Sequence, residues 1–170
     1  EMQNKKEDLQ THLKEIERLN KQAIRPHVKV KEKKFCLEKA LKHCTVLEEN
    51  GVKDPAMGDI YANYGKTISG EASDENLAKA WGIYRDSFDR FPQYCLTAMN
   101  KLLAIFGERG RKNKDSEKYL PLAGEALDLL RKHEEIDFST ESLTDLHGSC
   151  GDLFWDCRKL RDAEQEYLLV

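Results

Sequence analysis

The chain has 170 residues, of which 39% are hydrophobic and 35% charged, with a formal net charge of −3 and a mean hydropathy of −0.72. This length fits one domain of ordinary size, and the mixed charge argues against a disordered chain. The small net charge does not require nucleic acid or a membrane as a partner.

The five cysteines are odd in number and irregularly spaced, which does not indicate a disulfide framework. The chain also shows no secretory signal and no long apolar run. We therefore expect a reduced intracellular protein, cytoplasmic or nuclear, with no membrane partner. Because the chain begins at Glu1 rather than Met, we expect a fragment of a larger protein.

Strong helix formers dominate the chain and only four prolines interrupt it, so the predicted fold class is all-α. Residues 1–25 predict an N-terminal helix, with Leu9, Leu13, Ile16 and Leu19 at helical spacing. We expect this helix to pack on its neighbour. A short coiled coil that makes the chain a dimer stays open as an alternative.

Proline, glycine and capping residues predict the helices that follow, and we expect Ser73 and Ser139 to cap two of them. In the first of them we expect one apolar face that includes Phe35, Leu37, Ala40 and Cys44. A basic loop, 109–114, is expected after a helix that ends at Gly107 or Gly110. The predicted helices cover 31–50, 55–68, 73–91, 93–107, 118–133 and two segments within 139–170.

Two of the expected helix pairs share a pattern that ends with an Ala and a Tyr four residues apart on the second helix. The first helix carries an aromatic or His, then a residue followed by Gly, then an apolar residue. A glycine there allows two antiparallel helices to approach closely. The pattern occurs at Tyr61, Tyr64-Gly65, Ile68, Ala80 and Tyr84, and again at His147, Cys150-Gly151, Phe154, Ala163 and Tyr167.

This pattern resembles the tetratricopeptide repeat (TPR) family, with degenerate repeats over residues 31–170. The resemblance implies antiparallel helical hairpins stacked as a right-handed superhelix, an α-solenoid. It also implies a non-catalytic scaffold that binds a peptide or partner domain through a groove lined by the first helix of each hairpin. The partner-binding residues implied are Asn63, Lys66, Asn100, Lys101, Asp152 and Trp155.

Two other functions stay open. One is binding of RNA or another polyanion by the basic loop, through Arg109, Arg111, Lys112 and Lys114. The other is a regulatory repeat region beside an enzymatic domain that lies outside this fragment.

No motif indicates catalysis, a cofactor or a metal site. A phosphate-binding loop of the GxxxxGK[ST] type is absent. His147, Cys150 and Cys157 lie close in sequence, but no second pair completes four zinc ligands. We therefore expect these three residues to serve packing and a turn. We also expect Phe154 to be buried and Trp155 to point outward from its hairpin.

Overall fold

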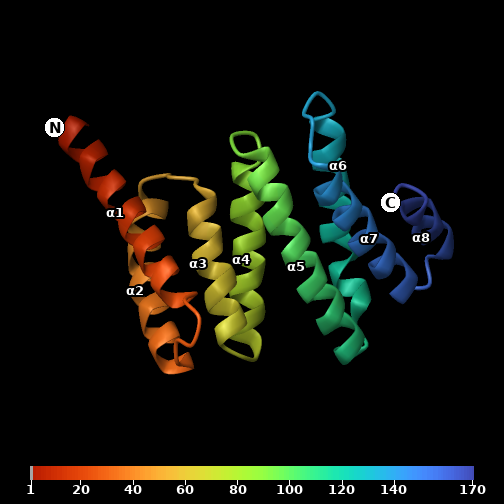
Figure 1. Ribbon diagram of the computed structural model, residues 1–170, viewed down its shortest axis with the longest axis horizontal. Helices are drawn as coiled ribbons and strands as arrows, with labels where there is room; N and C mark the ends of the chain where they lie inside the picture. The colour runs from red at the N-terminus through yellow and green to blue at the C-terminus, as the bar shows by residue number, and fades with distance from the viewer. Residues whose placement is uncertain (1) are drawn as a thin grey trace. The chain divides into compact units, whose positions relative to one another are not determined.

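The protein is described by a computed structural model that covers residues 2–170, with the backbone alone for residues 2–4 and 160. Over this range it contains α-helices and one 3₁₀ helix and no strand, which confirms the all-α fold class. The chain divides into two compact units, residues up to 87 and 88–170. Figure 1 labels the helices in chain order. The helices are α1 (Met2–Ala23), α2 (Val30–Glu49), α3 (Pro55–Thr67), α4 (Glu71–Ser87), α5 (Pro92–Asn113), η1 (Ser116–Tyr119), α6 (Leu120–Lys132), α7 (Thr140–Asp156) and α8 (Leu160–Tyr167).

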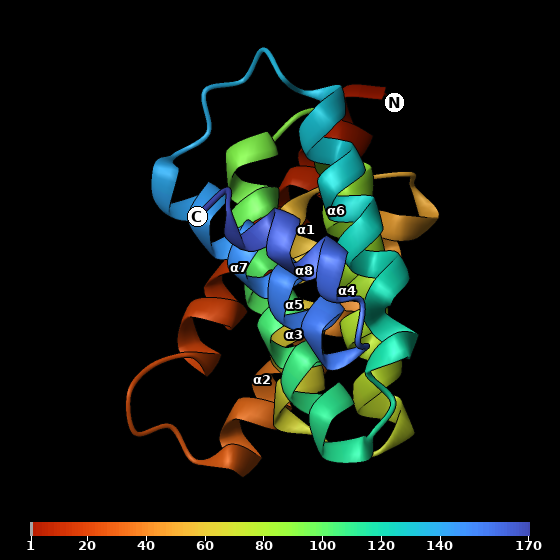
Figure 2. The same cartoon turned by 90° about the vertical axis from the view of Figure 1, so that its right-hand side faces the viewer.

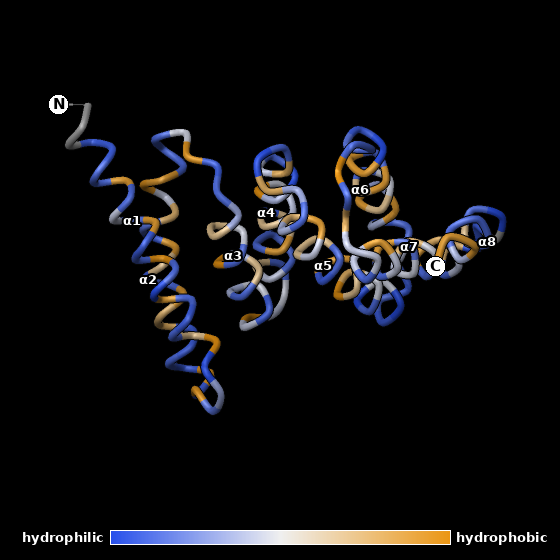
Figure 3. Tube along the Cα trace, turned by 45° about the horizontal axis from the view of Figure 1, so that its top comes forward, coloured by the Kyte–Doolittle hydropathy of each residue, from blue (hydrophilic) through white to orange (hydrophobic). Residues whose placement is uncertain are grey.

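In unit 1, α1 packs against α2 and α3. Ile16, Leu19 and Ala23 are buried, at one or two turns' spacing along α1. Figure 3 shows apolar and polar positions alternating along α1 and α2. The expected packing of the N-terminal helix on its neighbour is therefore confirmed, and the coiled-coil dimer stays a prediction.

The predicted apolar face of α2 is wrong at Phe35. This side chain is 56% exposed, whereas the adjacent Cys36 and Leu37 are buried. The buried positions of α2 follow the helical period from Cys36 and Leu37 through Ala40, and Phe35 lies outside that stripe. Its ring instead lies under the ammonium group of Lys39, 4.4 Å from the ring centroid.

Helices α3 and α4 form an antiparallel pair. A Cβ on Gly58 would come within 2.6 Å of the Tyr84 ring, and one on Gly65 within 2.9 Å of Leu77. As the residue number rises on α3 it falls on α4, so the two helices run in opposite directions. Ser73 was expected to cap α4, but the helix begins earlier, at Glu71. The Ser73 hydroxyl instead donates to the Gly65 carbonyl of α3.

In unit 2, α5 is longer than predicted, and the expected basic loop at 109–114 is wrong. The helix continues to Asn113 and ends where Lys114 adopts a left-handed conformation, with φ of 58°. Gly110 does not break the helix. A Cβ on residue 110 would lie only 2.7 Å from the Cα of Ser116, so a glycine is needed to leave room for that residue. Arg109, Arg111 and Lys112 therefore project from a helix.

Helices α7 and α8 close unit 2. The predicted cap of α7 is confirmed, since the Ser139 hydroxyl accepts a hydrogen bond from the backbone N–H of Ser142 at 3.2 Å. Cys150 and Leu153 are fully buried, but Phe154 is only partly buried. The expected burial of Phe154 is thus corrected, because the buried stripe of α7 runs one residue earlier.

Candidate binding groove between α5 and α7

A cavity of about 620 Å³ lies between α5 and α7, within unit 2. From α5 it is lined by Gln93, Thr97, Asn100 and Lys101, and from α7 by residues that include Ser142 and Asp145. The two helices pack directly on each other, although α6 lies between them in sequence. Asn100 and Lys101, both predicted as partner-binding residues, therefore share one cavity.

A hydrogen-bonded network fixes one end of this cavity. Gln93 Nε2 donates to Ser142 Oγ at 2.8 Å, and Gln93 Oε1 accepts from the backbone N–H of Ser139 at 3.0 Å. Ser139 Oγ in turn donates to Ser142 Oγ at 2.9 Å. One side chain of α5 thus holds the first turn of α7, so the wall of the cavity is formed before any ligand enters.

Asn100 is the least satisfied polar group of this wall. Its side chain is 7% exposed, and Nδ2 donates to the Ser142 carbonyl at 2.9 Å. That bond fixes the orientation of the amide, because a carbonyl can accept only from the nitrogen. Asn100 Oδ1 is buried and has no hydrogen-bond partner within the described part of the chain. Asn100 thus lines the cavity with a side chain whose buried acceptor has no donor.

The rim of the cavity carries both signs of charge. Lys101 is exposed on α5, and Glu141 and Asp145 are exposed on α7. A hydroxyl- and amide-lined cavity with a mixed rim suits a ligand with backbone-like N–H and C=O groups. It offers no concentration of positive charge.

The other predicted groove residues lie elsewhere. In unit 1, Asn63 is partly buried and donates to Asn20 Oδ1 at 2.8 Å, and Lys66 is exposed on α3. In unit 2, Asp152 accepts a hydrogen bond from the Tyr167 hydroxyl at 2.7 Å. The cavity between α5 and α7 therefore contains two of the six predicted residues.

Trp155 points outward, as predicted, and is 59% exposed. It lines a separate cavity of about 380 Å³ with Glu164, Tyr167 and Leu168. Leu168 is 80% exposed, so this end of unit 2 presents an apolar surface.

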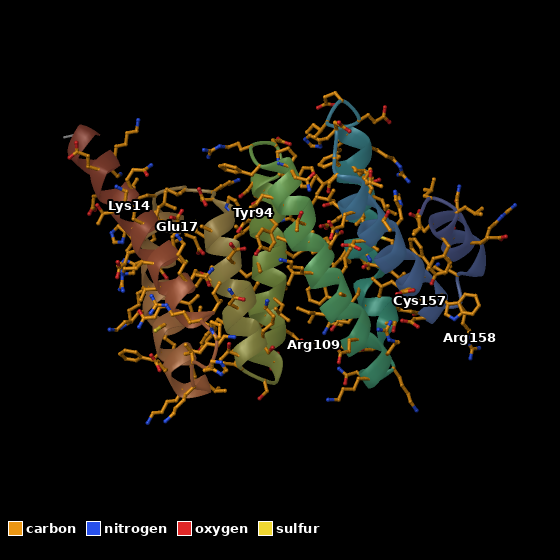
Figure 4. All side chains as sticks on the ribbon, viewed as in Figure 1. Lys14, Glu17, Tyr94, Arg109, Cys157 and Arg158 are labelled. Carbon is orange, nitrogen blue, oxygen red and sulfur yellow. The ribbon has the colours of Figure 1, made fainter. Side chains whose placement is uncertain are left out.

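The basic residues 109–114 do not form one positive surface. Arg111 Nη1 lies 2.9 Å from Asp156 Oδ2, and this pair lines a cavity of about 720 Å³. Lys114 and Arg158 line the same cavity, together with Asp115, Glu117 and Lys118. Figure 4 shows Arg109 on α5, and Cys157 and Arg158 at the turn between α7 and α8. The acidic neighbours reduce the positive potential that a polyanion would need.

The His and Cys side chains on α7 and at its end make packing and polar contacts within unit 2. His147 Nδ1 lies 2.7 Å from Glu166 Oε2, and burial raises the pKa of the Cys150 thiol to about 12. Burial and the nearby Glu117 and Asp156 also raise the pKa of Cys157. A thiol that stays protonated is a poor nucleophile and a poor metal ligand. No three His, Cys, Asp or Glu side chains gather as a metal site in the described part of the chain.

None of the described helices is long and apolar enough to cross a bilayer.

Sequence reasoning missed Gln93 and Ser142. Both lie within the first turn of a helix, where they looked like ordinary boundary residues after Pro92 and Ser139. The one sequence signal for these residues is that the first turns of α5 and of α7 both contain polar side chains. It becomes informative only once these two helices are known to be neighbours.

The chain matches no protein-family model, no characterised protein and no solved structure.

Proposed function

We propose that this chain is a non-catalytic interaction module that binds a peptide segment or partner domain in the groove between α5 and α7. The proposal takes the helix pairs as TPR-like hairpins stacked as a right-handed superhelix. Direct packing of α5 on α7 supports it, because the first helices of consecutive hairpins are neighbours in such a repeat. Asn63, Lys66, Asp152 and Trp155 keep their predicted roles as further contacts along the chain.

The observation that carries the proposal is the unsatisfied acceptor of Asn100. A buried polar group without a partner costs about 1–3 kcal/mol. A ligand N–H that reached Asn100 Oδ1 would remove this cost, and the backbone of an extended peptide supplies such donors at regular spacing. Lys101 and Asp145 on the rim would then select charged side chains of the peptide.

The groove is favoured over the basic residues 109–114 as the main binding site. Arg111 is already paired with Asp156, and the cavity beside it is lined by both charges, with Asp115 and Glu117 among its basic residues. A partner anion would have to compete with these carboxylates. Polyanion binding remains the alternative proposal.

A displayed library of random peptides, selected on the immobilised chain, tests the proposal. We expect the selected peptides to lose at least about tenfold in affinity with Lys101→Glu or Asp145→Lys, since a reversed rim charge repels the side chain it had attracted. Asn100→Ala should lose about as much, because it removes the acceptor.

The matched control is Lys112→Glu, which makes the same charge change at an exposed position of the same helix outside the cavity. It should leave affinity unchanged. If Lys112→Glu weakened binding and the groove variants did not, the groove proposal would fail in favour of the basic cluster.

A further inference from the structure

One end of the α1–α2 hairpin combines positive charge with exposed apolar side chains. Residues 24–35, called the basic tip below, contain five Lys or Arg and one Glu, which gives +4. Since the whole chain totals −3, all other residues together carry −7. The basic tip is therefore a positive segment in a chain that is otherwise acidic. Figure 2 shows the start of this segment as an open loop, red to orange at the lower left.

Three large apolar side chains of the basic tip are exposed. Ile24 is 54% exposed, Val30 68% and Phe35 56%. Single exposed apolar residues are common on protein surfaces, but these three fall within 12 residues and alternate with lysines. None of the three belongs to the buried stripe of α2, which begins at Cys36.

Helix stability does not account for the lysines either. Lys31, Lys33 and Lys34 lie in the first turns of α2, at the positive end of the helix dipole, where positive charge is unfavourable. Lys34 lies 3.8 Å from Glu38, but among the described residues Lys31 and Lys33 make no ion pair. These lysines thus lie where positive charge destabilises the helix, which indicates that they serve a purpose other than stability.

We propose that the basic tip docks on an anionic membrane surface, with Ile24, Val30 and Phe35 entering the interface and the lysines contacting lipid headgroups. Val30 opens α2, and Phe35 lies five residues later, about 7.5 Å along the helix at 1.5 Å per residue. Both residues therefore lie in the first two turns of α2, next to the segment that carries Ile24.

A lipid surface fits these side chains better than nucleic acid. Phosphate contacts would use the lysines alone, whereas base stacking needs free aromatic faces. Phe35 is the only aromatic ring of the tip apart from His27, and Lys39 already lies over one face of it. Ile24 and Val30 have no role on a phosphate backbone. From the sequence alone we expect no membrane partner, and the exposure of these three side chains changes that expectation. A surface contact needs no spanning helix.

Co-sedimentation with vesicles tests the proposal, using phosphatidylcholine with and without phosphatidylserine. We expect the chain to bind the anionic vesicles and not the neutral ones. The Lys31→Ala, Lys34→Ala double variant should bind about 25-fold more weakly, at about fivefold for each lysine removed near the surface. The Val30→Ser, Phe35→Ser double variant should lose about tenfold, because it removes the side chains that enter the interface.

The control is the Lys132→Ala, Lys159→Ala double variant, which removes the same charge from exposed positions of unit 2 that no proposed site includes. It should bind as the unchanged chain does. Circular dichroism of every variant checks that helix content is retained.

Three outcomes would overturn the proposal. The first is absence of binding to anionic vesicles. The second is binding that needs the lysines but is unchanged by Val30→Ser, Phe35→Ser. The third is binding of a single-stranded RNA oligonucleotide, with dependence on Lys31 and Lys34, in place of vesicle binding. The proposal concerns unit 1, so its failure would not affect the proposal for the groove between α5 and α7.

Discussion

The two units use the same contact in different surroundings. In unit 1, Tyr84 lies over Gly58 and donates to Asp59 at 2.5 Å. In unit 2, Tyr167 lies over Gly151 and donates to the adjacent Asp152 at 2.7 Å. In each case a Gly-Asp pair receives the ring on the glycine and the hydroxyl on the carboxylate. Yet Tyr84 is 2% exposed and Tyr167 is 41% exposed.

Because a glycine meets the tyrosine ring in both units, we attribute the glycine to this contact, and we expect the cost of replacing it to depend on how buried the ring is. A buried ring cannot move away from an added Cβ, whereas a half-exposed ring can rotate toward solvent. The predictions below test or refine this comparison.

The largest effect is expected for Gly58→Ala. The new Cβ would lie 2.6 Å from Cε1 of the Tyr84 ring, which has no room to shift. We expect the free energy of unfolding of unit 1 to fall by about 2–3 kcal/mol, as in overpacked cores. Amide hydrogen exchange of α3 and α4, measured over a series of urea concentrations, gives this free energy.

The control for this substitution is Gly148→Ala on α7, where an added Cβ would meet nothing within 4 Å. Alanine there should stabilise its unit by about 0.5–1 kcal/mol, because glycine is the poorer helix former. Equal effects of the two substitutions would show that the Tyr84 contact is not tight.

Gly151→Ala should have a smaller effect, a loss of about 1 kcal/mol or less. The clash with Tyr167 is as close, at 2.6 Å, but the ring is exposed and can turn aside. Hydrogen exchange in α7 and α8 provides the measurement. A loss as large as that of Gly58→Ala would refute the claim that burial sets the cost.

The third prediction concerns pH and the attachment of α1. His12 Nδ1 and His43 Nδ1 lie 2.7 Å apart between α1 and α2. Burial, followed by the charge of His12, holds the pKa of His43 below its usual value. Glu15 opposes this shift and Arg18 adds to it. The unfolded chain therefore takes up this proton more readily than the folded one.

The free energy of unfolding of unit 1 should consequently be fully retained above about pH 6.5 and fall as the pH drops below it. Hydrogen exchange in α1 and α2, measured from about pH 7 to about pH 5, should show this loss. His43→Gln should flatten the dependence. An unchanged slope in that variant would assign the effect to other groups.

The smallest effect is expected for Arg111→Ala. The Arg111–Asp156 pair joins α5 to α7 at the surface of unit 2, with Arg111 exposed. Exposed ion pairs contribute about 0.2–1 kcal/mol and are weakened by salt. Thermal unfolding at low and high salt measures it, and a loss above about 2 kcal/mol would mean that this pair holds unit 2 together.

The all-α class, the capping by Ser139 and the outward direction of Trp155 could be predicted because each follows from local sequence. The length of α5 could not, since Gly107 and Gly110 look like helix ends. Only the tertiary contact of Gly110 with Ser116 shows why a glycine is there. The sequence also could not show which glycine of a hairpin lies under its tyrosine ring. The sequence pattern aligns Gly65 with Gly151, but Gly65 faces Leu77, and the tyrosine of that hairpin lies over Gly58.

The candidate site was predictable in part for the same reason. Asn100 and Lys101 were predicted because the resemblance to TPR repeats implies a groove lined by first helices, and both line the cavity between α5 and α7. Gln93 and Ser142 were missed, because their role depends on the packing of α5 against α7. That packing joins residues about 50 positions apart, and no local pattern encodes it.

Two-dimensional NMR of the nitrogen-labelled chain with a selected peptide tests the groove most directly. We predict shifts of the Asn100 side-chain amide and of the Lys101, Ser142 and Asp145 backbone signals, with little change along 109–114. Shifts confined to 109–114, with the Asn100 amide unmoved, would contradict the groove and favour the basic cluster.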